Sequence, residues 1–183
     1  MMPATPAIKS RFGPWLTSVV IGLVLLKLWL ASALTVQAVG FANHDDALFI
    51  RLADFLLRGE WLGPYDQFTL AKGPMYSLFI AGAFLLGVPL LLAQQIFYAA
   101  ACALVLVALR PLVANRGVRL GLFAVLLFNP VTYDGFVHGR VLRQNILHSL
   151  VLMILAGLIG FYARRSSSKR SLLPWALLTG VAL

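Results

Sequence analysis

The sequence predicts an all-α, polytopic integral membrane protein. Of its 183 residues, 61% are hydrophobic and 11% are charged, whereas a soluble domain carries about 25% charged residues. The mean hydropathy is +0.89. A water-soluble fold could not bury so much apolar surface, but membrane helices satisfy their backbone hydrogen bonds internally. We therefore expect residues 1–183 to form a single transmembrane domain.

The formal net charge of +9 is carried by short basic blocks that stand between apolar runs. They comprise Lys9 and Arg11, the segment from Arg110 to Arg119, and the segment from Arg164 to Arg170. This spacing is typical of cytoplasmic loops. We therefore expect a cytoplasmic N-terminus and no nucleic-acid partner. The single cysteine excludes an intrachain disulfide and a cysteine metal cluster.

The first apolar run, from about Trp15 to Val39, predicts a transmembrane helix that acts as an uncleaved anchor. Lys27 lies near its middle, where an ionisable side chain is costly and suggests a function. Two interpretations stay open. Its side chain either faces a polar cavity between helices, or it extends to the interface because the span begins later.

The segment between Gly40 and Pro74 is the main polar part of the chain and holds five of the six acidic residues. We expect it to face the outside. Within it, Ala47–Arg58 has apolar side chains on one helical face and charged side chains on the other, which predicts a juxtamembrane amphipathic helix. Gly59 is expected to end this helix.

The apolar stretch from Met75 to Leu109 is interrupted at Gly87–Pro89, which predicts a short helix followed by a full-length one. Two topologies stay open. One net crossing keeps the loop from Arg110 to Arg119 cytoplasmic, with a partial or re-entrant helix over Met75–Leu86, whereas two crossings put that basic loop outside. The first fits the charge rule better. Gln94 and Gln95 are expected to form hydrogen bonds between helices.

The remaining chain predicts a second excursion to the outside. Leu120 to about Val131 rises outward, Thr132–Arg143 forms an external loop, and Asn145–Ala163 returns. A further helix begins at Leu172 and is cut off at Leu183, which is too short for a span. We therefore expect the chain to be the N-terminal part of a longer protein.

The sharpest chemical motif is Asn43-His44-Asp45-Asp46, directly before the amphipathic helix. Two interpretations stay open. Asn43 or Asp45 can cap the helix, and carboxylates in a first turn favour the helix dipole. Alternatively, one carboxylate is a general base, and the other orients it or helps to hold a metal ion.

Basic residues at the membrane boundary suggest contacts with phosphate. Lys72 precedes Gly73-Pro74 where the chain re-enters the membrane, and it either meets a lipid phosphate or extends to the interface. Arg140 and Arg143 can approach the same phosphate, bind lipid head groups, or pair with Asp134. Of the two nearby histidines, His138 is expected to be a loop residue and His148 a helix-packing residue, with metal binding as the alternative.

Three short segments carry a family resemblance: Asn43-His44-Asp45-Asp46-Ala47, Leu57-Arg58-Gly59-Glu60-Trp61 and Lys72-Gly73-Pro74-Met75-Tyr76. The chain resembles the N-terminal portion of the GT-C superfamily of polyprenyl-phosphate-sugar-dependent glycosyltransferases, in particular its protein mannosyltransferase and aminoarabinose transferase branch. The match runs from about Trp15 to Arg119, with a weaker continuation to Arg170. Asp-Asp stands where many relatives have Asp-Glu, and Gly-Pro where Pro-Pro is frequent.

The resemblance implies an inverting glycosyl transfer on the extracytoplasmic face of a bacterial inner membrane. An acceptor hydroxyl attacks the anomeric carbon, and polyprenyl phosphate leaves. The implied partners are a polyprenyl-phosphate-linked sugar, membrane lipids and an unidentified hydroxyl acceptor, with a possible divalent cation whose ligands stay unknown. The implied residues are the catalytic Asp45 and Asp46, the donor-phosphate contacts Lys72, Arg140 and Arg143, and the substrate contacts His44 and Tyr76.

Two other classes of function stay open. One is a non-catalytic membrane module that binds polyprenyl lipids through the same boundary residues. The other is a small transporter, for which Lys27 and the break at Gly87–Pro89 are the supporting features.

Overall fold

The computed structural model describes residues 14–36, 46–64, 73–133, 139–166 and 168–183. These residues fold almost entirely into helices and contain no strand. Three helices are long and apolar enough to cross a membrane: α1 (Pro14–Ser32), α4 (Leu90–Ala108) and α7 (Gln144–Ala163). The predicted all-α membrane fold is therefore confirmed.

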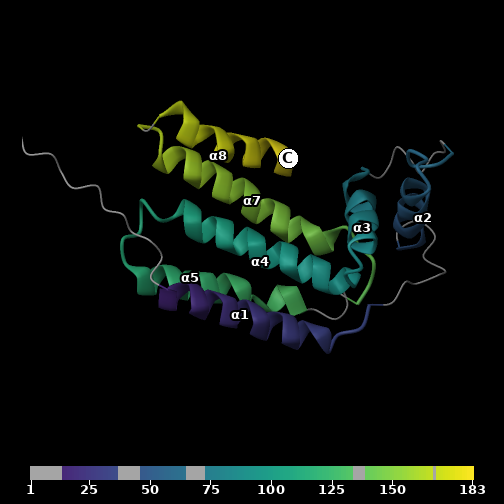
Figure 1. The fold of residues 1–183 in the computed structure, drawn as a ribbon, viewed down its shortest axis with the longest axis horizontal. Coiled ribbons are helices and arrows are strands. Elements are labelled where there is room, and N and C mark those ends of the chain that lie inside the picture. The colour runs from purple at the N-terminus through teal and green to yellow at the C-terminus, as the bar shows by residue number, and fades with distance from the viewer. Residues whose placement is uncertain (1–13, 37–45, 65–72, 134–138, 167) are drawn as a thin grey trace, which may run out of the picture.

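The long helices lie side by side in one layer, and two short helices lie at one end of it (Figure 1). Helix α4 packs against α1, α7 and α5 (Arg116–Leu127), and α7 also packs against α8 (Lys169–Ala182). The short helices α2 (Asp46–Leu57) and α3 (Met75–Leu85) pack against each other. A 3₁₀ helix, η1 (Pro130–Tyr133), follows α5.

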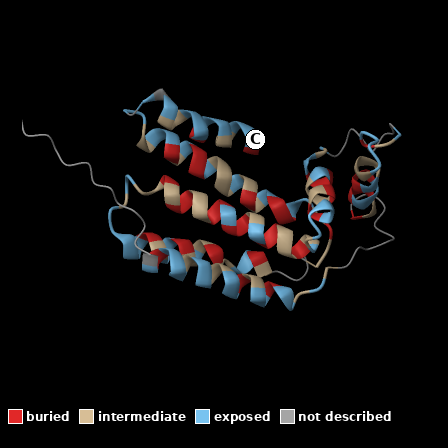
Figure 2. Cartoon of the chain, viewed as in Figure 1, coloured by how far each residue is buried: buried red, intermediate tan, exposed pale blue. Residues whose placement is uncertain are grey.

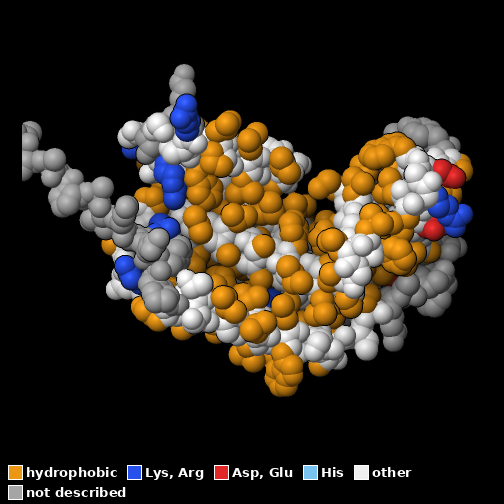
Figure 3. All heavy atoms as spheres, viewed as in Figure 1, with side chains coloured by type: hydrophobic (Ala, Val, Ile, Leu, Met, Phe, Trp, Pro, Cys, Tyr) orange, Lys and Arg blue, Asp and Glu red, His pale blue; other side chains and the backbone are white. Residues whose placement is uncertain are grey.

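Charged side chains gather at the two ends of the layer, and apolar side chains cover the face between them (Figure 3). We call one end the acidic end, because α2 and the turn after it carry Asp46, Asp54 and Glu60. We call the other the basic end, which carries Arg110, Arg116, Arg119 and Arg164. This separation of charge along the helices suits a protein whose middle lies in lipid.

The packed core lies where α4 meets its neighbours (Figure 2). Tyr98, Cys102 and Leu106 of α4 pack against Phe123 and Leu127 of α5. In contrast, the outer surface of α1 exposes large apolar side chains, and Trp29 is 70% exposed. A soluble monomer rarely leaves so large an apolar surface open to water, so hydrocarbon is the natural solvent for this face.

Helix α1 ends at Ser32, so it is shorter than the predicted run to Val39. The Ser32 hydroxyl donates to the Trp29 carbonyl oxygen, with an Oγ to O distance of 2.7 Å. Such a bond competes with the continuing helix. The part of the predicted run beyond Val36 lies outside the described residues.

Two other helix starts also differ from the predictions. Helix α5 begins at Arg116 instead of Leu120, because the Asn115 side chain accepts hydrogen bonds from the backbone of the first turn. Helix α8 begins at Lys169 instead of Leu172, after Ser168, whose extended backbone is typical of an N-cap. Apolar runs therefore placed these helices correctly but missed their polar first turns.

The predicted amphipathic helix is confirmed as α2. Leu48 and Leu52 are buried, whereas Asp54 and Arg58 on the other face are exposed. Gly59 ends the helix with φ +81°, and Glu60 donates its backbone N–H to the Phe55 carbonyl oxygen at 2.9 Å. This is a Schellman motif, which favours glycine because its left-handed position carries no Cβ.

The predicted break in the apolar stretch is also confirmed. Helix α3 ends at Leu85, Gly87 has φ +65°, and Pro89 precedes the first residue of α4. Helix α3 has 11 residues and is therefore about 16 Å long, while the hydrocarbon core is about 30 Å thick. It is too short to cross, in agreement with the predicted partial helix.

Candidate functional site

The second carboxylate of the acidic motif forms a buried ion pair at the acidic end. Asp46, the first residue of α2, is wholly buried. Arg140 donates to both of its oxygens, from Nη2 to Oδ1 at 3.0 Å and from Nε to Oδ2 at 3.3 Å. Two parallel bonds of this kind fix orientation as well as charge. The pair therefore joins α2 to the segment before α7, 94 residues later in the chain.

The segment that carries Arg140 is held in place from both sides. The Asn145 side chain donates from Nδ2 to the Arg140 carbonyl oxygen at 2.8 Å. The neighbouring apolar residues Val141 and Ile146 are buried against Phe49 of α2 and Tyr76 of α3. Packing on one side and a hydrogen bond on the other thus set the position of the guanidinium.

Tyr76 links the short helix α3 to the long helix α4. Its side chain is 2% exposed, and its hydroxyl accepts a hydrogen bond from Gln94 Nε2 at 2.9 Å. The Phe49 ring meets it edge to face, with ring centroids 5.0 Å apart. The predicted interhelical role of Gln94 is confirmed.

Next to the ion pair, an open groove of about 370 Å³ runs between α3 and α7. Its walls are mainly apolar, and the exposed Arg143, which caps the N-terminus of α7, supplies a cation. The lining residues are Gly73, Met75, Tyr76, Arg143, Ile146, Leu147, Leu150 and Leu183. A groove that combines a cation with apolar walls can hold a molecule with an anionic head and an apolar tail.

The structure brings four predicted site residues to this end: Asp46, Tyr76, Arg140 and Arg143. His44, Asp45 and Lys72 lie outside the described residues. So do Asp134 and His138, and the predicted pairing of Asp134 with an arginine stays a prediction. Lys72 immediately precedes Gly73, which lines the groove.

A second polar cluster surrounds Lys27 in α1. The ammonium is wholly buried and donates to the Thr132 hydroxyl, with an Nζ to Oγ1 distance of 2.8 Å. It lies 4.2 Å from the ring centroid of Tyr133 and 5.2 Å from that of Tyr98, distances typical of cation–π contacts. Lys27 thus faces the interior between helices, and the alternative of extension to the interface is wrong.

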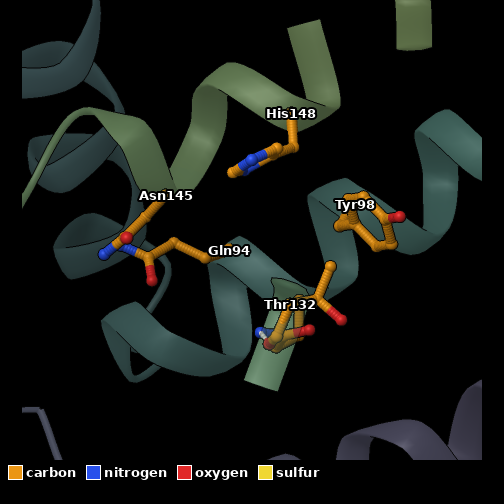
Figure 4. A pocket seen from close by; sticks show the side chains of 6 residues that line it. Gln94, Tyr98, Thr132, Asn145 and His148 are labelled. Carbon is orange, nitrogen blue, oxygen red and sulfur yellow. Dashed lines mark hydrogen bonds between the residues drawn. The ribbon is translucent and has the colours of Figure 1, made fainter. Parts of the chain in front are cut away.

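A row of polar side chains continues from this cluster toward the acidic end. Gln95 donates from Nε2 to the Thr132 carbonyl oxygen at 3.2 Å, which confirms its predicted interhelical role. Asn145 and His148 of α7 point toward Gln94 and line the same space as Thr132 (Figure 4). The space between these side chains is too small for a water molecule, so they form a packed polar seam.

Several acceptors in this seam have no hydrogen-bond partner among the described residues: Gln94 Oε1, Gln95 Oε1, Asn145 Oδ1 and His148 Nδ1. The Tyr133 hydroxyl at the edge of the seam is likewise buried, and burial raises its pKa. His148 packs between α7 and α4, as the sequence predicted, and it also lines the seam.

In the described part of the chain, no group of three or more histidine, cysteine, aspartate or glutamate side chains could hold a metal ion. The residues of the acidic motif before Asp46 are outside that part, so the metal ligands stay unknown.

Comparison of the chain with protein families, with curated proteins and with solved structures found no match. The case for a function therefore rests on the residues and the geometry of this chain.

Proposed function

We propose that this chain is the N-terminal part of a membrane glycosyltransferase of the GT-C type. It transfers a sugar from a polyprenyl-phosphate donor to a hydroxyl acceptor on the extracytoplasmic face of a bacterial inner membrane. The observation that carries the proposal is the groove between α3 and α7, which has Arg143 at its polar part and lies beside the Asp46–Arg140 pair.

The donor's two parts match the two parts of the groove. Its phosphate needs charge-assisted hydrogen bonds, which an arginine provides in a planar fork. Its prenyl tail needs an apolar surface, which Ile146, Leu147 and Leu150 provide. Lys72 is the residue before Gly73, which lines the groove, and we assign it as a second phosphate contact.

The proposed step forms a bond between the acceptor oxygen and the anomeric carbon. The bond from that carbon to the phosphate oxygen breaks, and its electron pair stays on the departing phosphate. Arg143 and Lys72 stabilise this developing charge. Asp45 takes the proton of the acceptor hydroxyl as general base.

Asp46 has a different role in this scheme. Its carboxylate is wholly buried, and both oxygens accept hydrogen bonds from Arg140. Both oxygens of this carboxylate are already occupied by Arg140, so we assign Asp46 to the positioning of Arg140 and of the segment before α7. The adjacent Asp45 is left as the base.

A first experiment tests the binding half of the proposal. The full chain, reconstituted in lipid nanodiscs, is titrated with a fluorescent polyprenyl monophosphate. We expect Arg143→Gln to weaken binding by about tenfold or more, since a hydrogen bond to a charged group contributes about 1.5–3 kcal/mol. Arg165→Gln, an exposed arginine on another part of the chain, is the matched control. Equal affinity in both variants would contradict the assignment of the groove.

A second experiment tests the chemistry. In the complete protein, Asp45→Asn is expected to abolish sugar transfer while binding of polyprenyl monophosphate stays unchanged, because the variant removes only the base. Full transfer activity in this variant would remove Asp45 from the mechanism.

One observation favours the second candidate function, a non-catalytic module that binds polyprenyl lipids. Asp46 is buried in its pair with Arg140, and the groove alone is sufficient for binding. The two experiments separate these functions: a binding module would hold polyprenyl monophosphate through Arg143 but show no transfer before any substitution. The transporter hypothesis has less support, because Lys27 is fixed by Thr132 and two aromatic rings.

A further inference from the structure

The basic end contains an arginine whose charge the described chain leaves unsatisfied. Arg119 lies in the second turn of α5, and its side chain is 7% exposed. Its Nε and Nη1 atoms have no hydrogen-bond partner among the described residues. A buried guanidinium is normally paired or hydrogen-bonded, because removing its donors from water is costly.

The surroundings of Arg119 are positive. Burial lowers the pKa of its guanidinium, and the charges of Arg110 and Arg116 lower it further. The first turn of α5 contains no acidic residue, and the N-terminal end of a helix itself carries partial positive charge. The acidic residues that the structure describes lie at the opposite end, on α2 and just after it. The site therefore favours an anion strongly.

Arg164 at the same end shows what a satisfied arginine looks like here. It donates to the carbonyl oxygens of Val107 at 3.1 Å, Gly160 at 3.2 Å and Ala108 at 3.4 Å. Its guanidinium also lies 4.7 Å from the ring centroid of Trp175. The end of α4 thus provides acceptors for Arg164, whereas Arg119 has none of this kind for Nε and Nη1.

An apolar groove lies close to these arginines along α4. It has a volume of about 190 Å³ and lies between the first half of α1 and the second half of α4. Its lining residues are Thr17, Val20, Ala103, Leu106 and Val107. Val107 precedes Arg110 by one helical turn. The groove therefore lies toward the same end of α4 as these arginines, and lipid-binding sites combine cations with an apolar groove in this way.

We propose that the basic end binds an anionic phospholipid. Its phosphodiester accepts hydrogen bonds from Nε and Nη1 of Arg119 and is attracted by Arg110 and Arg116, and one acyl chain lies in the groove between α1 and α4. A lipid fits better than a soluble phosphate, because the groove toward this end is apolar and because this end lies at the termini of helices that are long and apolar enough to cross a membrane. The site is separate from the acidic end and does not depend on the proposed enzymatic activity.

The test is thermal unfolding of the purified full chain in a neutral detergent, with and without phosphatidylglycerol. At a hundredfold excess over Kd, the lipid is expected to raise the Tm by about 5–10 °C. Arg119→Gln is expected to remove most of this rise. The matched control is Arg165→Gln, whose exposed guanidinium lies over the Tyr162 ring and whose loss should leave the rise intact. An equal rise in the Arg119 variant would overturn the proposal.

Two further arms identify the ligand. Phosphatidylcholine, which has the same tails and no net charge, should give little rise, and inorganic phosphate should give none. An equal rise with inorganic phosphate would assign the site to a free anion and overturn the lipid assignment.

A second variant keeps the test decisive where Arg119→Gln fails to fold. Ala103→Phe leaves every arginine in place and fills the groove between α1 and α4. It should reduce the number of phosphatidylglycerol molecules retained in native mass spectrometry. Undiminished retention would contradict the proposed position of the acyl chain.

Discussion

The two ends of the molecule place an arginine in opposite electrostatic surroundings. At the acidic end, Arg140 reaches the buried carboxylate of Asp46, and the chain neutralises its own charge. At the basic end, Arg119 is more deeply enclosed, since it is 7% exposed whereas the Arg140 side chain is 27% exposed, but its Nε and Nη1 have no described acceptor. The same kind of side chain therefore has a different role at each end. The paired arginine is part of the fold, and the unpaired one is a candidate for a ligand from outside.

The largest expected effect comes from breaking the pair at the acidic end. Arg140→Gln leaves the Asp46 carboxylate buried without its bidentate partner, and this should lower the free energy of unfolding by about 3–5 kcal/mol. The measurement is denaturant unfolding in micelles. The double variant Asp46→Asn, Arg140→Gln should recover much of the loss, because no unpaired charge remains. If the double variant is as unstable as Arg140→Gln, the lost stability comes from packing around the Arg140 side chain and not from an unpaired charge on Asp46.

The next effect concerns the packing of α8, whose Trp175 contacts Arg164 at the basic end. A Cβ at Gly160 would collide with the Trp175 ring. The Arg164 guanidinium lies over the same ring. Gly160→Ala should therefore destabilise by up to about 3 kcal/mol. Gly82→Ala in α3 is the control, since its new Cβ meets no atom within 4 Å. Tryptophan emission during unfolding reports both, and an unchanged midpoint for Gly160→Ala would contradict the close packing.

A smaller effect is expected at Arg164 itself. Arg164→Gln removes hydrogen bonds to backbone carbonyls and leaves no buried charge unpaired. The expected loss is about 1.5 kcal/mol, clearly less than for Arg140→Gln. Unfolding midpoints of the two variants in one detergent compare them directly. An equal loss would mean that the hydrogen bonds from Arg164 to backbone carbonyl oxygens stabilise the fold as much as the Asp46–Arg140 ion pair.

The smallest effect should come from an ion pair on the same helix as Asp46. Asp54 and Arg58 are 2.6 Å apart, but their side chains are 50% and 64% exposed. Asp54→Asn is expected to change the free energy of unfolding by less than about 0.5 kcal/mol. A loss above about 1 kcal/mol would show that exposure does not weaken ion pairs in this protein as it does in general.

Local patterns in the sequence were sufficient for most of the fold. The amphipathic pattern before Gly59 predicted α2, the Gly87–Pro89 break predicted the division between α3 and α4, and apolar length predicted the spanning helices. These features depend on neighbouring residues. The starts of α5 and α8 were missed because polar residues that cap a first turn carry no hydropathy signal.

The contacts that build the site could not be predicted in the same way. Asp46 and Arg140 are separated by 94 residues, and nothing in a local pattern selects one arginine over another as the partner of a carboxylate. Arg140 was expected near a phosphate or Asp134, and the pair with Asp46 was not foreseen. The packing of Val141 and Ile146 against α2 and α3, together with the hydrogen bond from Asn145 to the Arg140 carbonyl oxygen, favours that choice.

The contact between Lys27 and Thr132 has a consequence for how the protein enters the bilayer. The two residues are 105 positions apart, and a chain grows at about 5–20 residues per second, so Lys27 waits roughly 5–20 seconds for its partner. Lys27 lies five residues before the end of α1, so its cost on insertion as a lone helix is at most the roughly 2.5–3.5 kcal/mol of a lysine at a helix centre. The leucine and valine side chains around it must offset that cost during this interval. Helix α1 therefore inserts before Lys27 has its hydrogen-bond acceptor. Thr132 of η1 offsets part of the cost only after that segment has been synthesised.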